Sequence, residues 1–343
     1  MKSYLVKLLS ALAIVVIAHV TIILTVPAII SAEYWVRETI VVKEAIAASL
    51  PSPRIIFLAG SSTMFGVDAK QVEEGTGLPT VNFGLRGGMQ LSRLLKIGED
   101  VVRPGDVLVL GLERAYYVCG QDNWSPWLLR NSIAWDRDYF NSLPLRQRVE
   151  LALSQSDSTL AFEVIGDYAL SSVFPGMYQK RLAAIAPPDQ VMKRFRSGAE
   201  LPSTFAYSAF NMDDRGTTLH TQGSFAVDPA SMSTVLIPAA ICPDTLKTLR
   251  QFVATMKARR VRVIFSHSPI MVEGRPDKEW PQAETLFARD IHAIGSELLE
   301  DRQVVFFPRP DFFNFFEHLN EAARRRRTVQ IIADLKRLGV ARK

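Results

Sequence analysis

The chain has 343 residues, of which 48% are hydrophobic and 22% charged, so it can bury one large core or two small ones and is not a disordered protein. Its 40 basic residues against 35 acidic ones give a net charge of only +5, and the composition indicates no nucleic-acid partner. The densest basic cluster, Arg324 to Arg327, is interpreted as the solvated face of a helix in preference to a dedicated site. Outside a membrane it could also meet anionic lipid or polysaccharide.

An uncharged apolar run opens the chain. No charged side chain occurs between Lys7 and Glu33, and the stretch from Leu8 to Ala32 is long enough to cross the roughly 30 Å hydrocarbon core of a bilayer as a helix. By the positive-inside rule, the lysines before the run predict a short cytoplasmic tail and an extracytoplasmic remainder. We therefore expect residues 1–33 to hold the tail and a single span of the inner (cytoplasmic) membrane, with the bulk of the chain in the periplasm.

A cleaved signal peptide is the alternative interpretation of this run. Signal peptides usually have an apolar region of roughly 7–15 residues and a small-x-small cleavage site. This run is longer and ends PAIISAEYW without a clean site, which favours a retained signal anchor. His19 lies within the span; in a lone helix with no acidic partner it is interpreted as a tolerated polar residue and not as a proton-relay group.

Strand and helix patterns alternate after an expected linker at residues 34–53. The runs RIIFLAG, PTVNFG, DVLVLGLE, VRVIFSHSP and QVVFF are typical of buried parallel strands, and most are separated by segments with helical spacing. The alternation predicts an α/β domain over residues 54–343, with five parallel strands and helices on both faces of the sheet. Gly60, Glu113 and His267 would then gather at the carboxyl edge of the sheet, where such folds bind ligands.

The strand pattern is lost between about residues 116 and 238. This segment is too long for a simple loop, so we expect a partly helical insertion. Its tryptophans at 124, 127 and 135 are interpreted as the core of the insertion, with stacking on sugar rings as the alternative.

The chain has two cysteines, Cys119 and Cys242. They are too few for a disulfide framework and fit no metal-ligand spacing. In an oxidising compartment they could pair, and the sequence leaves this open. Because no motif supports a metal or a nucleotide, we expect neither a metal nor a cofactor.

Two serines directly follow the first predicted strand, in FLAGSSTMFG. Gly-Ser-Ser is commoner as a turn, but a serine at a strand end can also be a nucleophile if it has a base and preformed oxyanion donors. His318, just before the last predicted helix, would lie at the same edge of the sheet, with Asn320 as the N-cap of that helix. His267 ends another predicted strand and competes with His318 for the role of base.

These residues and their order resemble the SGNH (GDSL-like) hydrolase and acyltransferase superfamily. The resemblance is to membrane-anchored members that act in cell-surface polysaccharide O-acetylation or teichoic-acid D-alanylation. It covers about residues 54–113 and 244–340 and implies a three-layer α/β/α domain with a flavodoxin-like sheet. GSS at 60–62 resembles the first family block and implies Ser62, not Ser61, as the nucleophile.

Two further blocks extend the resemblance. VNFGLRGG at 81–88 is similar to the second block and implies Gly87 or Gly88, together with the Ser62 N–H, as oxyanion donors. HLNEAARRRRT is similar to the last block and implies His318 as the base.

The chain departs from the family pattern at three positions. Glu113 stands where the family has an oxyanion asparagine, and it is expected to bind a substrate hydroxyl or a basic side chain instead; His267 could also contact substrate. Phe315 stands where the acid that orients the histidine is usual, and Ala323 replaces a common glycine, a change of small consequence.

The missing acid leaves the orienting group open. The nearest polar candidates are Asn314, Glu317 and Asp311, and a backbone carbonyl is a further possibility. If Asn314 is the partner of His318, activity would be very low, because asparagine in place of a triad aspartate costs about 10⁴ in turnover in a serine protease.

The leading hypothesis is a membrane-anchored extracytoplasmic serine acyltransferase or esterase. It would add or remove O-acetyl groups on a cell-surface polysaccharide, with the membrane and an acylated glycan as partners and a membrane-bound acyl donor as a possible one. The alternative is a catalytically impaired SGNH-like protein that binds polysaccharide or scaffolds an export complex, which Phe315 and Glu113 favour. The sequence defines neither the acyl donor nor the acceptor, nor the direction of transfer.

Overall fold

A computed structural model describes residues 2–26, 29–119, 126–154, 158–176, 179, 185–224, 240–272, 280–299 and 305–342. These residues form two compact units, Met1–Arg37 with Asn123–Gln190 and Glu38–Asp122 with Val191–Lys343. Helix α2 (Tyr34–Ser49) runs from the first unit into the second.

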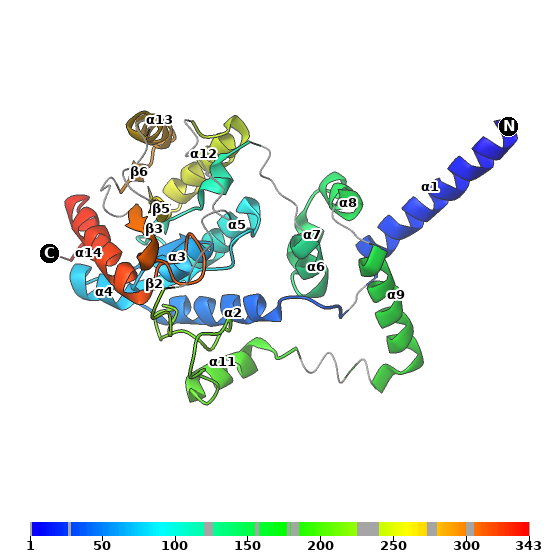
Figure 1. Cartoon of the computed structure of the whole chain (residues 1–343), viewed down its shortest axis with the longest axis horizontal. Coiled ribbons are helices and arrows are strands. Elements are labelled where there is room, and N and C mark those ends of the chain that lie inside the picture. The colour runs from blue at the N-terminus through cyan, green and yellow to red at the C-terminus, as the bar shows by residue number, and fades with distance from the viewer. Residues whose placement is uncertain are drawn as a thin grey trace. The chain divides into compact units, whose positions relative to one another are not determined.

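The first unit is helical. Its helices are α1 (Lys2–Thr25), α6 (Pro126–Ala134), α7 (Arg137–Ser142), α8 (Leu145–Ser154) and α9 (Ser158–Val173), with the first turn of α2. They share an apolar core that includes Ile23 of α1 and Val164 of α9. The stretch Ser3–Thr25 is long and apolar enough to cross a membrane, as the uncharged run predicted; α1 is blue and α9 green in Figure 1.

The predicted insertion at residues 116–238 is partly helical, but it is divided between the two units. Residues 123–190 cluster with the N-terminal segment, because apolar side chains of α6 to α9 pack against the end of α1. Helix α11 (Pro188–Ser197) lies at the boundary. Of the three tryptophans, Trp124 and the side chain of Trp127 lie outside the described residues, while Trp135 is half-buried and donates its indole N–H to Asn131 Oδ1 at 2.6 Å.

The second unit contains a five-stranded parallel sheet, as predicted. Its strands are β1 (Ile55–Ala59), β2 (Thr80–Gly84), β3 (Val107–Leu110), β4 (Arg262–Phe265) and β6 (Glu297–Leu298), in the order β2-β1-β3-β4-β6. Every neighbouring pair is parallel, and Ala59 at the end of β1 stands beside Gly84 at the end of β2. The carboxyl ends of the first three strands therefore lie together.

The fifth strand is not the one that the sequence predicted. QVVFF was expected to enter the sheet, but Phe306–Pro308 forms β7, which pairs with β5 (Ile270–Val272) in a separate two-stranded sheet. Helix α13 (Trp280–Ala293) ends just before Gly295, which takes a left-handed conformation with φ +79°, and the chain turns directly into β6. Glu297 of β6 then pairs with Arg262 of β4 at 2.6 Å.

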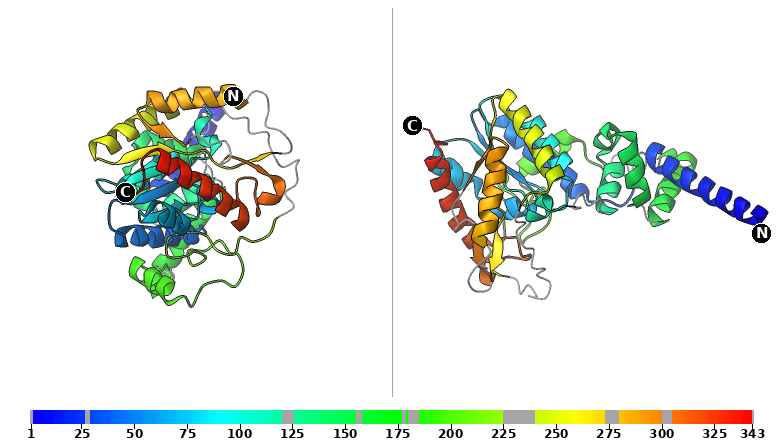
Figure 2. Two further views of the ribbon diagram at one scale, coloured as in Figure 1. Left: turned by 90° about the vertical axis from the view of Figure 1, so that its left-hand side faces the viewer. Right: turned by 90° about the horizontal axis from the view of Figure 1, so that it is seen from above.

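Helices cover both faces of the sheet. On one face, Phe57 and Val109 pack with Val72 of α4 (Ala69–Thr76) and Leu335 of α14 (Glu321–Arg337). On the other face, Leu58 and Leu108 approach Gly98 of α5 (Leu91–Val101), beside Phe252 of α12 (Pro243–Ala258). Figure 2 shows α14 in red and α12 in yellow on either side of the strands. The strand alternation thus delivers consecutive side chains to opposite faces.

Most of the segment expected to be a linker is helical. Residues 34–49 form α2, whose Lys43 is fully buried and donates to the Gly84 carbonyl at 2.7 Å. Burial lowers the pKa of Lys43 to about 7, against a smaller opposing effect of Asp213. A buried lysine within an otherwise amphipathic stretch is difficult to distinguish from a solvated one in sequence.

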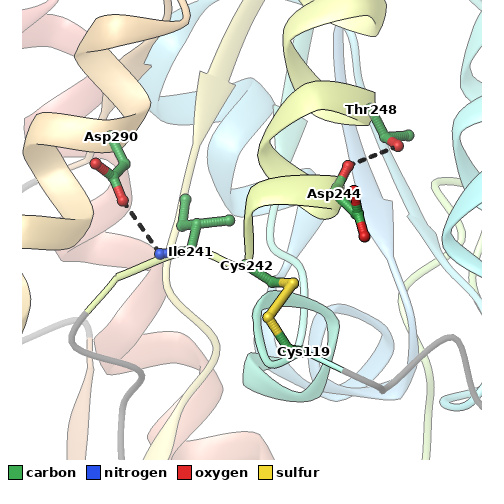
Figure 3. Close-up of a disulfide and its surroundings, with 6 residues drawn as sticks. All are labelled: Cys119, Ile241, Cys242, Asp244, Thr248 and Asp290. Atoms are coloured by element: carbon green, nitrogen blue, oxygen red, sulfur yellow. Dashed lines mark hydrogen bonds between the residues drawn. A yellow bond between two sulfur atoms is a disulfide. The ribbon is translucent and has the colours of Figure 1, made fainter.

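Cys119 and Cys242 form a disulfide, which resolves the pairing that the sequence left open. The bridge joins the segment after the short helix η1 (Arg114–Tyr117) to the N-cap of α12. Figure 3 shows that the adjacent residue, Ile241, donates its N–H to Asp290 Oδ2, at 3.1 Å. The start of α12 is therefore tied to two other elements.

Candidate functional site

The two serines lie at the start of α3 (Ser61–Gly66), immediately after β1. Asn82 of β2, which is fully buried, holds this helix: its Nδ2 donates to Val67 O at 2.8 Å and Thr63 O at 3.0 Å, and its Oδ1 accepts from Gly84 N at 2.9 Å. Sequence analysis missed Asn82. The available signal was a lone amide inside an apolar strand, because a buried polar side chain must find hydrogen-bond partners.

Ser62, the predicted nucleophile, is fully buried and contacts Glu113. Its hydroxyl donates to Glu113 Oε1 at 2.9 Å, and its backbone N–H donates to the same oxygen at 3.0 Å. Gly60 N donates to Glu113 Oε2 at 3.3 Å. The Ser62 N–H, expected as an oxyanion donor, is therefore occupied by a carboxylate, and Glu113 lies where the developing charge would be stabilised.

Glu113 and Glu317 influence each other's ionisation. Burial raises the pKa of Glu113, although hydrogen bonds from Ser62 and Gly60 oppose the rise. Burial and then the charge of Glu113 raise the pKa of Glu317, while the nearby Arg114 lowers it. Like charges in a shared low-dielectric region disfavour ionisation of both carboxyls, so this cluster favours the uptake of a proton.

His318, the predicted base, contacts Asn314, which is itself held by Tyr207. Its Nδ1 lies 2.7 Å from Asn314 Oδ1, and Asn314 Nδ2 donates to the hydroxyl of Tyr207 at 3.1 Å. The contact with Tyr207 points the amide oxygen toward the imidazole. Nδ1 then carries the hydrogen and Nε2 carries the lone pair, which is the tautomer that a general base needs.

The surroundings of His318 keep the imidazole neutral. Its ring stacks on Phe65 of α3, with centroids 4.1 Å apart and an interplanar angle of 7°. Burial lowers the pKa of His318 to about 3. Within the described part of the chain, Nε2 has no hydrogen-bond partner. Nε2 is thus a buried acceptor without a donor, and the Ser62 hydroxyl donates to Glu113 and not to this nitrogen; the low pKa makes the imidazole a weak base.

The other two polar candidates have different partners. Asp311 forms an ion pair with Arg326 at 2.6 Å, and Glu317 is acted on by the charges of Glu113 and Arg114. Phe315, which replaces the usual acid, packs against the rings of Phe316 and His318, with centroids 4.1 and 5.1 Å apart. The sequence left three polar orienters open, and Asn314 is the one that the structure places on Nδ1.

The remaining predicted residues, Gly87, Gly88 and His267, lie in the same unit but take no part in the hydrogen bonds between Ser62 and Glu113. Gly87 lies beside Ser61, because a side chain at Gly87 would place its Cβ 2.9 Å from Ser61 Oγ. Gly88 adopts a left-handed conformation with φ +79°. His267 follows β4 and packs against Phe287 with centroids 4.9 Å apart. Burial, aided by Arg114 and Arg327, lowers the pKa of His267 to about 4.

The arginine run is not a uniformly solvated face. Arg324 and Arg327 are buried, whereas Arg325 and Arg326 are exposed. Arg327 donates to His267 O at 2.6 Å and to Gly66 O at 3.1 Å, and thereby joins the loop after β4 to the end of α3. Residues three apart share one side of a helix, so the run has an inward and an outward half.

A cavity of about 580 Å³ lies beside the first turn of α14. Its lining is polar and of mixed charge, and includes Lys70, Asp213, His220 and Arg324, but neither Ser62 nor His318. Among the described residues, no group of three or more histidine, cysteine, aspartate or glutamate side chains could hold a metal ion.

Comparison with known proteins adds no family assignment. No protein-family model, curated protein or solved structure matches this chain. Any function must therefore be inferred from the residues themselves.

Proposed function

We propose that the second unit is a three-layer α/β/α domain of the SGNH type. The sheet order, counted along the chain as 2-1-3-4-5, is that of flavodoxin-like sheets, and helices pack on both faces. The placement of Gly60 and Ser62 after the first strand and of His318 before the last helix agrees with the family blocks.

The chain is proposed to be a single-pass protein of the cytoplasmic membrane with its bulk in the periplasm. Helix α1 has the necessary length and composition, and Lys2 and Lys7 at its start favour a cytoplasmic N-terminus. The Cys119–Cys242 disulfide supports an oxidising compartment for the second unit.

The proposed activity is serine acyl transfer to or from a cell-surface polysaccharide. The observation that carries it is His318, which is neutral, oriented through Nδ1 by Asn314, and without a partner for Nε2 in the described part of the chain. Ser62 Oγ attacks the carbonyl carbon of an acyl ester, and its proton passes to Nε2. The proton then goes to the departing alkoxide, and the acyl group stays on Ser62. A glycan hydroxyl or water next attacks the acyl carbon and gives its proton to Nε2, which passes it to Ser62 Oγ as the bond to the acyl group breaks.

Glu113 must give way for this reaction. In the structure, its carboxylate accepts hydrogen bonds from the backbone N–H groups of Ser62 and Gly60. During the reaction these N–H groups would have to donate to the oxyanion instead. A neutral carboxyl is a weaker acceptor and would not repel the oxyanion, so the raised pKa of Glu113 favours its release.

The second candidate is a catalytically impaired SGNH-like protein that binds polysaccharide or scaffolds an export complex. The occupation of the Ser62 N–H by Glu113 favours it, as does the low basicity of His318.

A fluorophosphonate probe separates the two candidates. The full chain in detergent is incubated with the probe, and the labelled residue is located by peptide mass spectrometry. We expect labelling at Ser62 that is lost in Ser62→Ala and His318→Ala. Ser61→Ala is the matched control, since it changes the adjacent, partly exposed hydroxyl and should retain the label.

Labelling at Ser61 would preserve acyl-transfer chemistry but reject Ser62 as the nucleophile. If a folded sample stays unlabelled, both in the natural sequence and in Glu113→Gln, the impaired candidate is the correct one.

A further inference from the structure

Helix α9 of the first unit has an exposed apolar face. Phe162 and Val173 are 75% and 68% exposed, and Ile165 and Tyr168 are also exposed. The spacing of Phe162, Ile165 and Val173, with Ala169 between them, places them on one side of the helix. Soluble proteins rarely expose a contiguous apolar face, and such a face usually marks a site of contact with a protein or a membrane.

The opposite side of α9 is apolar as well, and it is already used. Leu160 and Val164 are buried in the core shared with α1. The two acidic residues of α9 are engaged within the same unit: Asp167 accepts from Ile29 N at 2.7 Å, and Glu163 pairs with Arg130 at 2.8 Å. A helix on a soluble surface normally turns a charged face to water, and α9 does not.

If α1 crosses a membrane, its length indicates how deep in the bilayer the start of α9 lies. The side chains from Leu8, the first residue after Lys7, to Ala18 are all exposed. At about 1.5 Å per residue this portion covers only about 16 Å of a hydrocarbon core that is roughly 30 Å thick. The crossing therefore needs the following turns, and there Val20, Ile22 and Ile23 pack into the core with α8 and α9.

The end of α1 gives an independent marker of the interface. Arg137 of α7 donates to the carbonyls of Ile23 and Leu24, the last turn of α1. Arginine at the end of a spanning helix lies at headgroup level, where its charge reaches water and lipid phosphate. Leu160 and Val164 at the start of α9, which share a core with the turn before it, therefore lie on the hydrocarbon side of that level.

We propose that α9 is a second membrane-contacting element, with the face that carries Phe162, Ile165 and Val173 on lipid acyl chains at the outer interface beside α1. This inference rests on the proposed membrane anchor. The lipid surface is the occupant that the geometry favours because α9 packs on the last turns of α1, which the crossing needs to reach the full thickness of the hydrocarbon core. Tyr168 suits the same position, since tyrosine is enriched at membrane interfaces.

The test uses single introduced cysteines in the full chain, labelled with a fluorophore and reconstituted into phosphatidylcholine and phosphatidylglycerol vesicles. Ile17→Cys reports on α1, Val173→Cys on α9, and Arg146→Cys on the solvated side of α8, where the natural Arg146 is exposed and pairs with Glu150. Labelling is done without reductant, so that Cys119 and Cys242 stay paired. Quenching is measured with nitroxide-labelled lipids and with aqueous iodide.

We expect nitroxide lipids to quench the probes at Ile17 and Val173, the latter at a depth of roughly 5–10 Å below the headgroups, and iodide to quench the probe at Arg146. If the probe at Ile17 is lipid-quenched while the one at Val173 is quenched by iodide, α9 faces water and the inference is wrong although the anchor stands. Protection of the Val173 probe from both quenchers would mean that protein covers α9, which also overturns it. Failure of nitroxide lipids to quench at Ile17 would reject the anchor itself.

Discussion

The buried pair of Arg54 and Asp106 connects the starts of the strands whose ends carry Ser62 and Glu113. Both side chains are fully buried, and Arg54 Nε and Nη2 donate to Asp106 Oδ2 at 2.9 and 2.8 Å. Asp106 also accepts the backbone N–H of Arg54 at 3.2 Å and of Arg103 at 2.9 Å. Asp106→Ala would leave the Arg54 charge with only backbone carbonyls, those of Ala47 and Val101, as acceptors.

Removing one partner of such a pair lowers the free energy of unfolding by about 3–5 kcal/mol, because the remaining charge is buried without compensation. The matched control is Glu297→Ala, which breaks the ion pair with Arg262. The side chains of Arg262 and Glu297 are 36% and 40% exposed. Solvent screens that pair, and its loss should cost about 0–1 kcal/mol.

Urea denaturation of the full chain in detergent, followed by circular dichroism, measures both changes. Asp106→Asn keeps an acceptor oxygen and gives an intermediate value if Asp106→Ala does not fold. The reasoning is refuted if Asp106→Ala and Glu297→Ala lower the free energy of unfolding by the same amount.

Three further predictions follow from the site and the disulfide. Because burial raises the folded pKa of Glu113, the folded state binds its proton more tightly than the unfolded state; the stabilisation is complete below the ordinary value of 4.5 and is lost as the pH rises through the raised pKa. The free energy of unfolding should therefore fall less steeply with rising pH in Glu113→Gln, whereas the exposed control Glu74→Gln should leave the fall unchanged. Urea denaturation at a series of pH values above 4.5 measures both variants. Asn314→Asp should raise the pKa of His318 and increase the rate at which the fluorophosphonate labels Ser62 by up to about 10⁴-fold. The labelling rate is measured as a function of pH, and an unchanged rate and pH profile would contradict the role of Asn314. Reduction of Cys119–Cys242 should lower the free energy of unfolding by about 2–5 kcal/mol, while the double alanine variant should not respond to reductant; equal sensitivity of the two would contradict the structural role of the bridge.

The first four strands could be predicted because each is a short, mostly apolar run that contains β-branched residues and is followed by, or ends at, a glycine or a polar residue. Strand β6 could not, since it contains only Glu297 and Leu298 and follows a turn at Gly295. A strand of this length leaves no periodic pattern, so the apolar QVVFF further along the chain was the stronger signal.

The site was only partly predictable for a similar reason. The contact of Asn314 with His318 joins residues four apart, and the sequence included it among three alternatives. The contact of Glu113 with Ser62 depends on the direction of a side chain in the loop between β3 and η1, which spacing does not encode.

The burial of Arg327 was also beyond the sequence. It depends on carbonyl acceptors at His267 and Gly66, both distant along the chain, whereas a run of arginines by itself indicates solvent. Polar residues whose partners lie far away in sequence are thus the ones that sequence analysis misplaced.

The most direct test of the proposed function is the detection of an acyl-enzyme. The full chain is incubated with a chromogenic acetyl ester, quenched in acid, and analysed by intact-protein and peptide mass spectrometry. We expect an acetyl adduct on Ser62, more abundant in Glu113→Gln, where no carboxylate holds the hydroxyl and the Ser62 N–H, and absent in His318→Ala. A folded protein that forms no adduct on Ser62 in either the natural sequence or Glu113→Gln would contradict it.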